Sequence, residues 1–237
     1  MNWEKFTWLV SEQRLWMTWL PMLEDKYEGK TPIIVSEEFQ QALSNAKTDA
    51  DRTVINANID KMRRFATAFY DNYYVSCWTM NETESDLMWR SYTSSTNAVA
   101  IQTTCEIVKN SIPKYLDVGL VRYIDYKTQG FSNFNIFEWP MHKRLQFVDD
   151  REVRILATGN IPAEAGGDEL RACIFYRQSG TSRVRICAPQ IEPSALIGAM
   201  RLHPSSTELF ARGAAQYCRD HGIIEPEQSE LTGAGTF

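Results

Sequence analysis

The stretch Asp150-Arg151-Glu152-Val153-Arg154-Ile155-Leu156-Ala157 alternates charged and aliphatic side chains. We predict a β-strand over residues 152–157, because side chains at every second position of a strand lie on the same face. Asp150, Glu152 and Arg154 then share one face, and the aliphatic residues between them point into a core. The charged row is either a solvated strand face or a place where paired charges meet a substrate.

The bulk composition favours a folded protein with one substantial core. The chain has 237 residues, of which 43% are hydrophobic and 12% aromatic, enough to bury a core in a single domain. No apolar run approaches the roughly 20 residues that a membrane span requires, and the start Met1-Asn2-Trp3-Glu4-Lys5 lacks the order of a signal peptide. We therefore expect a soluble, cytoplasmic protein with no membrane partner.

Charge and motif content exclude several common functions. The net charge of -5 gives no overall attraction to nucleic acid phosphates. The five cysteines form no close pair, which disfavours a zinc knuckle or a redox pair, and their odd number disfavours a secreted disulfide framework. The sequence has no phosphate-binding glycine loop, dinucleotide fingerprint or helical zinc motif, and its three histidines are scattered.

The order of predicted elements indicates an α+β fold. Helical patterns cover roughly residues 36–44, 51–70, 82–92 and 205–221. Strand patterns cover residues 15–19, 73–78, 98–101, 119–123, 152–157, 172–176 and 184–186, and loops are expected at 129–135 and 162–168. Strands and helices do not alternate strictly. We predict a single domain over residues 1–224, with a mixed or antiparallel β core flanked by helices, and a flexible tail over residues 225–237.

Three other segments carry residues that suit a binding site. Met88-Trp89-Arg90-Ser91-Tyr92 closes a helix just before a strand, where an aromatic face and a hydroxyl either meet a ring or belong to the core. Asp25-Lys26-Tyr27-Glu28-Gly29 either anchors a loop over a pocket or only uses Asp25 as a loop cap. Lys143 and Arg144 either meet a diphosphate or face water.

Four blocks in the same order resemble the bacterial domain-of-unknown-function family 2971 (DUF2971). The resemblance covers most of the chain, and its most specific match is the second block. The blocks are Leu15-Trp16-Met17-Thr18 leading to Asp25-x-x-Glu28-Gly29, Ser76-Cys77-Trp78 through Leu87-Met88-Trp89-x-x-Tyr92 to Ala98-Val99-Ala100-Ile101, Lys143-x-x-x-Phe147-x-x-Asp150-x-Glu152-Val153-Arg154, and Leu196-Ile197-Gly198-Ala199-Met200. The family usually has Glu where this chain has Asp150. The shorter side chain of Asp places more weight on Glu152.

The order of these blocks is also similar to the plan of ADP-ribosyltransferases, several of which are bacterial toxins or antiphage effectors. This weaker resemblance implies an ADP-ribosyltransferase-like fold and NAD as the substrate that donates the ADP-ribose. It also implies a nucleic acid or protein acceptor, and an antitoxin or another defence protein as a partner.

The chemistry of NAD cleavage gives the candidate residues their roles. Breaking the nicotinamide glycosidic bond builds positive charge on the ribose, which a nearby carboxylate stabilises. The resemblance then implies catalytic roles for Glu152, Asp150 and Tyr92. It implies NAD contacts for the side chains Trp89, Arg154, Lys143, Thr18 and Trp78. No metal is required.

Two other functions stay open. A noncatalytic recognition domain would use the basic strand Arg183-Val184-Arg185 and exposed aromatic residues to bind nucleic acid or a protein. A nucleotide hydrolase or nuclease would use Asp150 and Glu152 to hold a divalent ion. A strict Mg²⁺ requirement would favour the second of these.

Overall fold

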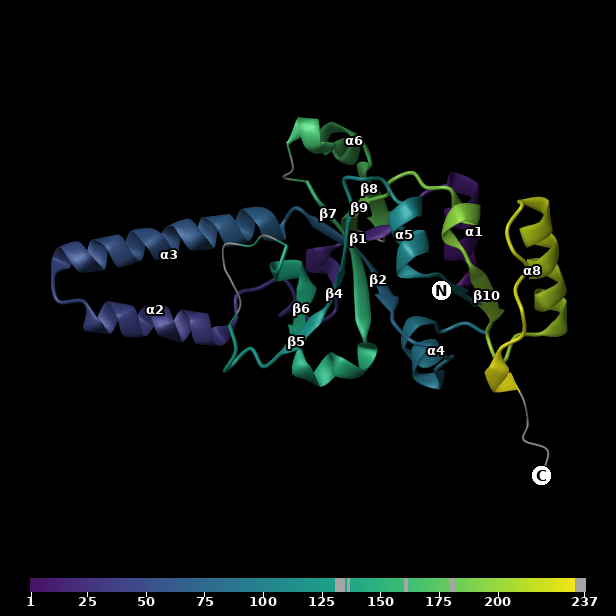
Figure 1. Cartoon of the computed structure of the whole chain (residues 1–237), viewed down its shortest axis with the longest axis horizontal. Coiled ribbons are helices and arrows are strands. Elements are labelled where there is room, and N and C mark those ends of the chain that lie inside the picture. Colours follow the sequence, from purple (N-terminus) through teal and green to yellow (C-terminus); the bar gives the residue numbers. More distant parts are fainter. Residues whose placement is uncertain (131–134, 136, 160–161, 180–181, 233–237) are drawn as a thin grey trace, which may run out of the picture. The chain divides into compact units, whose positions relative to one another are not determined.

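In a computed structural model, the chain forms two compact units, each built from separate segments of the sequence (Figure 1). The structure describes residues 1–130, 135, 137–159, 162–179 and 182–232. Residues 17–80 and 115–187 form the sheet unit, and residues 1–16, 81–114 and 188–237 form the second unit. The mixed α+β class with an antiparallel sheet and several helices is confirmed. The single domain expected over residues 1–224 differs from this division.

The sheet unit contains a six-stranded sheet in the order β4-β7-β2-β1-β9-β8, in which each neighbouring pair is antiparallel. A separate parallel pair joins β5 and β6. The strands are β1 (Met17–Trp19), β2 (Tyr73–Thr79), β4 (Asp117–Leu120), β5 (Arg122–Ile124), β6 (His142–Arg144), β7 (Glu152–Thr158), β8 (Ile174–Ser179) and β9 (Ser182–Cys187). The α-helices are α2 (Ile33–Asn45), α3 (Asp49–Tyr70) and α6 (Gly167–Ala172). The 3-10 turns are η1 (Leu20–Met22), η2 (Trp139–Met141), η3 (Leu145–Asp150) and η4 (Ala163–Ala165).

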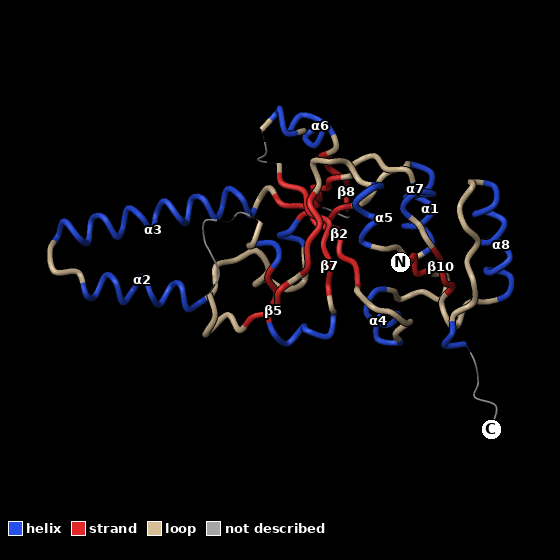
Figure 2. Tube along the Cα trace, in the orientation of Figure 1, coloured by secondary structure: helices blue, strands red, loops and turns tan. Residues whose placement is uncertain are grey.

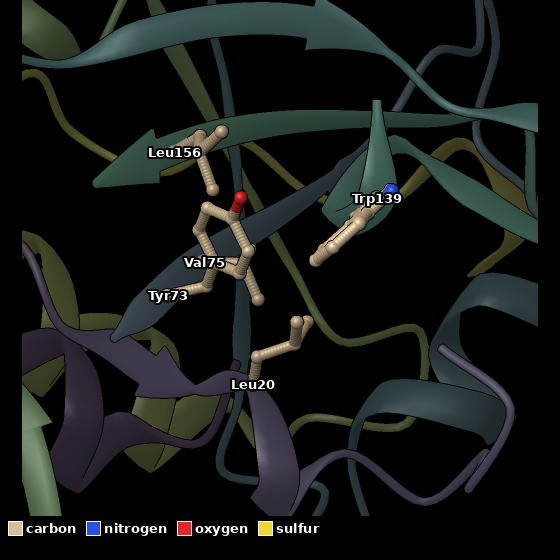
Figure 3. Close-up of a cluster of buried hydrophobic side chains, with 5 residues drawn as sticks. All are labelled: Leu20, Tyr73, Val75, Trp139 and Leu156. Carbon is tan, nitrogen blue, oxygen red and sulfur yellow. The ribbon is translucent and has the colours of Figure 1, made fainter. Parts of the chain in front are cut away.

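One face of this sheet packs an apolar cluster formed by the side chains Leu20, Tyr73, Val75, Trp139 and Leu156. Val75 of β2 lies directly opposite Leu156 of β7, so the two side chains share a face. Each of the five side chains is at most 1% exposed. Figure 3 shows Leu20, Tyr73, Val75 and Leu156 close together, with the flat ring of Trp139 beside them. Hydrophobic burial is the main source of stability at this end of the sheet.

Helices α2 and α3 run side by side as an antiparallel pair between η1 and β2 (Figure 2). A capping box fixes the start of α3: the Thr48 hydroxyl accepts from the Asp51 amide, and the Asp51 carboxylate accepts from the Thr48 amide. Phe69 near the end of α3 packs against the apolar cluster. The helices predicted at 36–44 and 51–70 are confirmed, with starts two to three residues earlier.

The second unit is mainly helical. Its only strands among the described residues are β3 (Val99–Gln102) and β10 (Ala199–Leu202), which pair antiparallel. Its helices are α1 (Trp3–Glu12), α4 (Asp86–Tyr92), α5 (Cys105–Ser111), α7 (Pro193–Leu196) and α8 (Glu208–Asp220), with a final 3-10 turn η5 (Glu230–Thr232). Trp3 of α1 packs edge-on against Phe210 and Tyr217 of α8, at centroid distances of 5.3 and 5.4 Å.

Several features of the second unit differ from the sequence-based expectations. Helix α1 was not predicted, although its buried residues Phe6, Leu9 and Val10 have helical spacing. The tail expected to be flexible from residue 225 is held in place as far as residue 232. The Glu227 amide donates to the Met200 carbonyl (2.9 Å), and Arg201 forms ion pairs with Glu227 and Glu230. These contacts explain why this polar segment is ordered.

Across the described residues, no helix combines the length and apolar character that a bilayer crossing would need.

Candidate functional site

The apolar face of the sheet continues into a group of buried charges that centres on Arg154. Arg154 of β7 lies opposite Cys77 of β2 and Gly119 of β4, and its exposed fraction is 0%. Its Nε donates to Glu152 Oε1 at 2.6 Å, its Nη1 donates to the Pro140 carbonyl at 2.5 Å, and its Nη2 donates to Glu28. Each nitrogen of the guanidinium therefore has a partner, as burial of this charge requires.

Glu152 is the first residue of β7 and is 3% exposed. Its Oε1 accepts from Arg154, and its Oε2 accepts from Lys143 Nζ at 3.1 Å. Its amide donates to the Tyr123 hydroxyl at 2.8 Å, which fixes the backbone at the strand start. Burial raises the pKa of Glu152, but the charges of Arg154 and Lys143 outweigh burial and leave the pKa below its ordinary value. The carboxylate therefore stays ionised.

Glu28 is the second acid bound to Arg154, and it comes from the loop between η1 and α2. It is 4% exposed. Burial raises the pKa of Glu28, against the opposing charges of Arg154 and Lys143. The next residue, Gly29, has a φ of +72°, and a Cβ there would lie 2.4 Å from Leu20 Cδ2. Only glycine fits this turn, which turns the chain immediately after Glu28.

Lys143 of β6 lies among three carboxylates. Its Nζ is 2.7 Å from Asp150 Oδ2, 3.1 Å from Glu152 Oε2 and 3.8 Å from Glu28 Oε1. Burial lowers the pKa of Lys143, but the carboxylates outweigh burial and raise the pKa above its ordinary value. The ammonium group therefore stays protonated near neutral pH. We call Glu28, Lys143, Asp150, Glu152 and Arg154 the ionic cluster.

Asp150 belongs to the ionic cluster, but it is not part of the strand in which it was predicted. Strand β7 starts at Glu152, and Asp150 is the last residue of η3. Arg151 between them has a φ of 43°, so strand alternation does not extend to Asp150. The prediction that Asp150 shares the strand face by alternation is wrong. Its carboxylate is still joined to Glu152 through Lys143, and its side chain is 29% exposed.

The burial of Glu152 and Arg154 also excludes an ordinary solvated strand face at these two positions. The aliphatic residues of the strand behave as expected on the other face, where Ile155 is 1% exposed. Strand β7 is therefore covered on both faces. Its charges are part of the interior of the sheet unit rather than of its surface.

A bidentate ion pair fixes the neighbouring loop. Arg144 Nε and Nη2 each lie 3.0 Å from a carboxylate oxygen of Asp25. The same Asp25 accepts from the Tyr27 amide at 3.1 Å, which confirms the predicted loop cap. The Arg144 guanidinium also lies over the Tyr27 ring, 4.6 Å from its centroid. Asp25 therefore anchors the loop that carries Glu28. Neither Lys143 nor Arg144 simply faces water.

Of the other predicted site residues, some lie in the second unit and some in the sheet unit. Trp89 and Tyr92 lie on α4 in the second unit. Trp89 is 3% exposed, its indole donates to Glu84 at 3.1 Å, and its ring packs edge-on against His203. Tyr92 is 46% exposed.

In the sheet unit, Trp78 and Thr18 lie away from the charges. Trp78 points to the face opposite Arg154, and its indole donates to Ser76 Oγ at 3.1 Å. Thr18 lies opposite Val75, on the face that carries the apolar cluster. The structure therefore joins Lys143, Asp150, Glu152 and Arg154, and it places Thr18 and Trp78 elsewhere on the sheet.

The sequence reasoning missed Glu28 and Tyr123 as members of the site. The Asp25-x-x-Glu28-Gly29 block is the available signal for Glu28, but the pattern by itself indicates only a loop cap at Asp25. Tyr123 had no signal, since its contact is to a backbone amide 29 positions later.

The ionic cluster is not arranged as a metal centre. Within the ranges described, no group of three or more His, Cys, Asp or Glu residues has the arrangement to hold a metal ion. Glu28, Asp150 and Glu152 instead surround an ammonium group. The geometry thus offers no support for the divalent ion expected between Asp150 and Glu152 in a nuclease.

No family model, curated protein or solved structure matches this chain. The resemblances to family 2971 and to ADP-ribosyltransferases therefore stay predictions.

Proposed function

We propose that the ionic cluster is the reacting centre of an NAD-consuming ADP-ribosyltransferase-like enzyme, with Glu152 as the acid that faces the ribose. The supporting observation is the state of Glu152: its carboxylate is buried at the end of a strand, and Arg154 and Lys143 keep it ionised. An ionised carboxylate in a place shielded from water is the group that stabilises positive charge developing on a sugar.

The energetics favour a functional role over a structural one. Desolvation of two charges often costs more than their attraction returns, and hydrophobic residues at such a place are frequently as stable or more stable. The same face of the same two strands carries Val75 and Leu156 a few residues away. Apolar side chains could therefore also have occupied positions 152 and 154 of β7. Charges that cost stability are typical of active sites.

In the proposed reaction, the bond between ribose C1′ and the nicotinamide nitrogen breaks, and its electron pair leaves with the nicotinamide. A nucleophile of the acceptor bonds to C1′ and loses its proton. Glu152 accepts a hydrogen bond from a ribose hydroxyl and stabilises the charge on the sugar. Arg154 acts as a positioning residue, since its three nitrogens fix Glu152, Glu28 and the Pro140 carbonyl. Asp150 is a companion acid at the more exposed side of the cluster.

The acceptor in this proposal is a nucleic acid or a protein, and the enzyme acts as a toxin or an antiphage effector. That part rests on the similarity of the motif order to ADP-ribosyltransferases. An inhibitory antitoxin or another defence protein would be its partner.

A noncatalytic recognition domain is the second candidate. Strand β8 lies at one edge of the sheet, and its residues Phe175 and Tyr176 are 37% and 58% exposed. Exposed aromatic residues on an edge strand are typical of partner binding. Arg185 of the neighbouring β9 contributes less than the sequence suggested, because it donates to Asn72 at 3.0 Å and lies over the rings of Trp19 and Tyr74.

The test is to incubate the protein with labelled NAD and a cell extract, and to measure nicotinamide release and label transfer. Wild type is compared with Glu152→Gln and with Glu38→Gln, a matched change on the exposed surface of α2. We expect both activities in wild type and Glu38→Gln, and a loss of about 100-fold or more in Glu152→Gln, as for other groups that stabilise transition-state charge. A folded wild type with neither activity contradicts the proposal. Partner binding that survives Glu152→Gln without any turnover favours the recognition domain.

A further inference from the structure

Both carboxylate oxygens of Glu152 are occupied within the protein. Oε1 accepts from Arg154 Nε at 2.6 Å, and Oε2 accepts from Lys143 Nζ at 3.1 Å. Because Glu152 is only 3% exposed, a ligand hydroxyl reaches one of its oxygens only where one of these two cations makes room. The two cations differ in how firmly they are held.

Arg154 is the fixed partner. Its remaining nitrogens bind the Pro140 carbonyl and Glu28, and the side chain is 1% exposed. Withdrawing this guanidinium from Glu152 would break or strain a further buried ion pair and a bond to the backbone. Leaving such buried groups without partners is strongly unfavourable.

Lys143 is the releasable partner. Its side chain is 11% exposed, and its shortest contact is to Asp150, whose side chain is 29% exposed. A lysine stem is flexible, and its ammonium group is easily hydrated. Lys143 can therefore leave Oε2 of Glu152 and keep Asp150 as a partner on the side of the cluster that meets water.

We propose that Lys143 is an autoinhibitory residue: in the resting protein its ammonium group occupies Oε2 of Glu152, and a ligand gains this oxygen only when Lys143 moves aside with Asp150. This inference deepens the proposed function and rests on it for the identity of the ligand. With Lys143 displaced together with Asp150, the two carboxylates of Glu28 and Glu152 face the single guanidinium of Arg154. The cluster then favours a ligand that brings a hydroxyl donor together with a positive charge, such as the ribosyl-pyridinium half of NAD.

The contact between Lys143 and Glu152 can be tested without NAD, by treating the protein with a water-soluble carbodiimide and an amine and measuring the modification of Glu152 by mass spectrometry. Carbodiimides react with the protonated carboxyl group. Loss of an adjacent positive charge raises a carboxyl pKa by about 1–3 units, so Lys143→Met should increase the modification rate about tenfold or more. Lys143→Arg should behave as wild type. Lys127→Met, at an exposed lysine of the same unit, should also leave the rate unchanged.

Lys143→Gln is a second variant that keeps a hydrogen-bond donor, and it tests the same contact if Lys143→Met does not fold. If the folded variant and wild type show the same modification rate at Glu152, the inference is overturned. Arg154 and the surrounding chain would then be the groups that block access to Glu152.

A separate arm adds saturating NAD to Lys143→Met. Protection of Glu152 from modification is expected if NAD takes the place that Lys143 vacates. Faster modification without protection by NAD supports the autoinhibitory contact and contradicts the proposed function. The two failures are therefore distinguishable.

Discussion

The apolar cluster and the strand residues of the ionic cluster, Glu152 and Arg154, lie on one face of the same sheet, where β7 pairs with β2. At one end Val75 lies opposite Leu156, and at the other Cys77 lies opposite Arg154. Leu156 and Arg154 are both fully buried. Met141 lies near the border, since it packs on the apolar cluster and a Cβ on Gly119 would lie 3.2 Å from its Cε. The same pair of strands thus buries apolar side chains at one end and charged side chains at the other.

The two ends differ in what they contribute to the stability of the fold. The apolar end gains free energy from each methylene that it removes from water. The ionic end must first overcome desolvation of its charges, and its five groups stabilise mainly one another. Changes at the apolar end should therefore lower stability alone, whereas changes at the ionic end should lower activity at Glu152 and lower stability where a buried charge is left without its partner.

The largest effect on stability is expected for Arg154→Met. The change leaves Glu28 and Glu152 buried with only Lys143 as a nearby cation. Breaking a buried pair in this way costs about 3–5 kcal/mol. Urea unfolding monitored by tryptophan fluorescence measures the loss. A loss within 1 kcal/mol of zero, allowing for about that much scatter in mutational data, would mean that the carboxylates reach water and are not a buried cluster.

Leu156→Ala is expected to cost about 2–5 kcal/mol, because it opens a cavity in the apolar cluster. Nicotinamide release per folded molecule should stay unchanged, since Leu156 packs in the apolar cluster. A selective loss of turnover in fully folded Leu156→Ala would show that the two ends are not separable.

Gly29→Ala should cost about 1–3 kcal/mol, because it places a Cβ 2.4 Å from Leu20 Cδ2 in a turn with positive φ. Thermal unfolding measures this change. Gly29 packs against Leu20 of the apolar cluster and directly follows Glu28 of the ionic cluster. We therefore expect the variant to lose stability and also to weaken the ion pair between Glu28 and Arg154. Normal stability would argue against the turn described here.

The smallest expected effect is a difference in pH dependence between Glu28→Gln and Glu152→Gln. Burial raises the pKa of Glu28, whereas at Glu152 burial is outweighed by Arg154 and the pKa is lowered. Glu28 therefore contributes less stability as the pH rises above its ordinary pKa of 4.5, and Glu152 loses its contribution as the pH falls below that value.

Relative to wild type, Glu28→Gln should gain unfolding free energy and Glu152→Gln should lose it as the pH is raised from about 3 to about 7. Urea titrations across this range measure both slopes. Slopes of the same sign would contradict the opposite environments of the two acids.

The sequence predicted β2 and β7 well, because both strands carry strong local patterns of aliphatic and aromatic residues. The single strand expected over residues 119–123 is instead divided between β4 and β5. It also pointed to Glu152, Arg154 and Lys143. It placed Asp150 incorrectly because one residue, Arg151, adopts a positive φ and breaks the alternation. Glu28 could not be joined to Arg154 by any local pattern, since 126 positions separate them. The ordered segment 225–232 depends on contacts with Arg201 that composition does not reveal.

The most direct test measures unfolding free energy and nicotinamide release together in Glu152→Gln and Leu156→Ala. Glutamine keeps an acceptor for Arg154, so Glu152→Gln should lose no more than about 1.5–3 kcal/mol, the worth of a charge-assisted hydrogen bond, while nicotinamide release falls about 100-fold or more. Leu156→Ala should show the reverse, with lower stability and unchanged release per folded molecule. Nicotinamide release that persists within twofold of wild type in folded Glu152→Gln, allowing for about 0.4 kcal/mol of scatter, would contradict the assignment of the ionic cluster as the reacting centre.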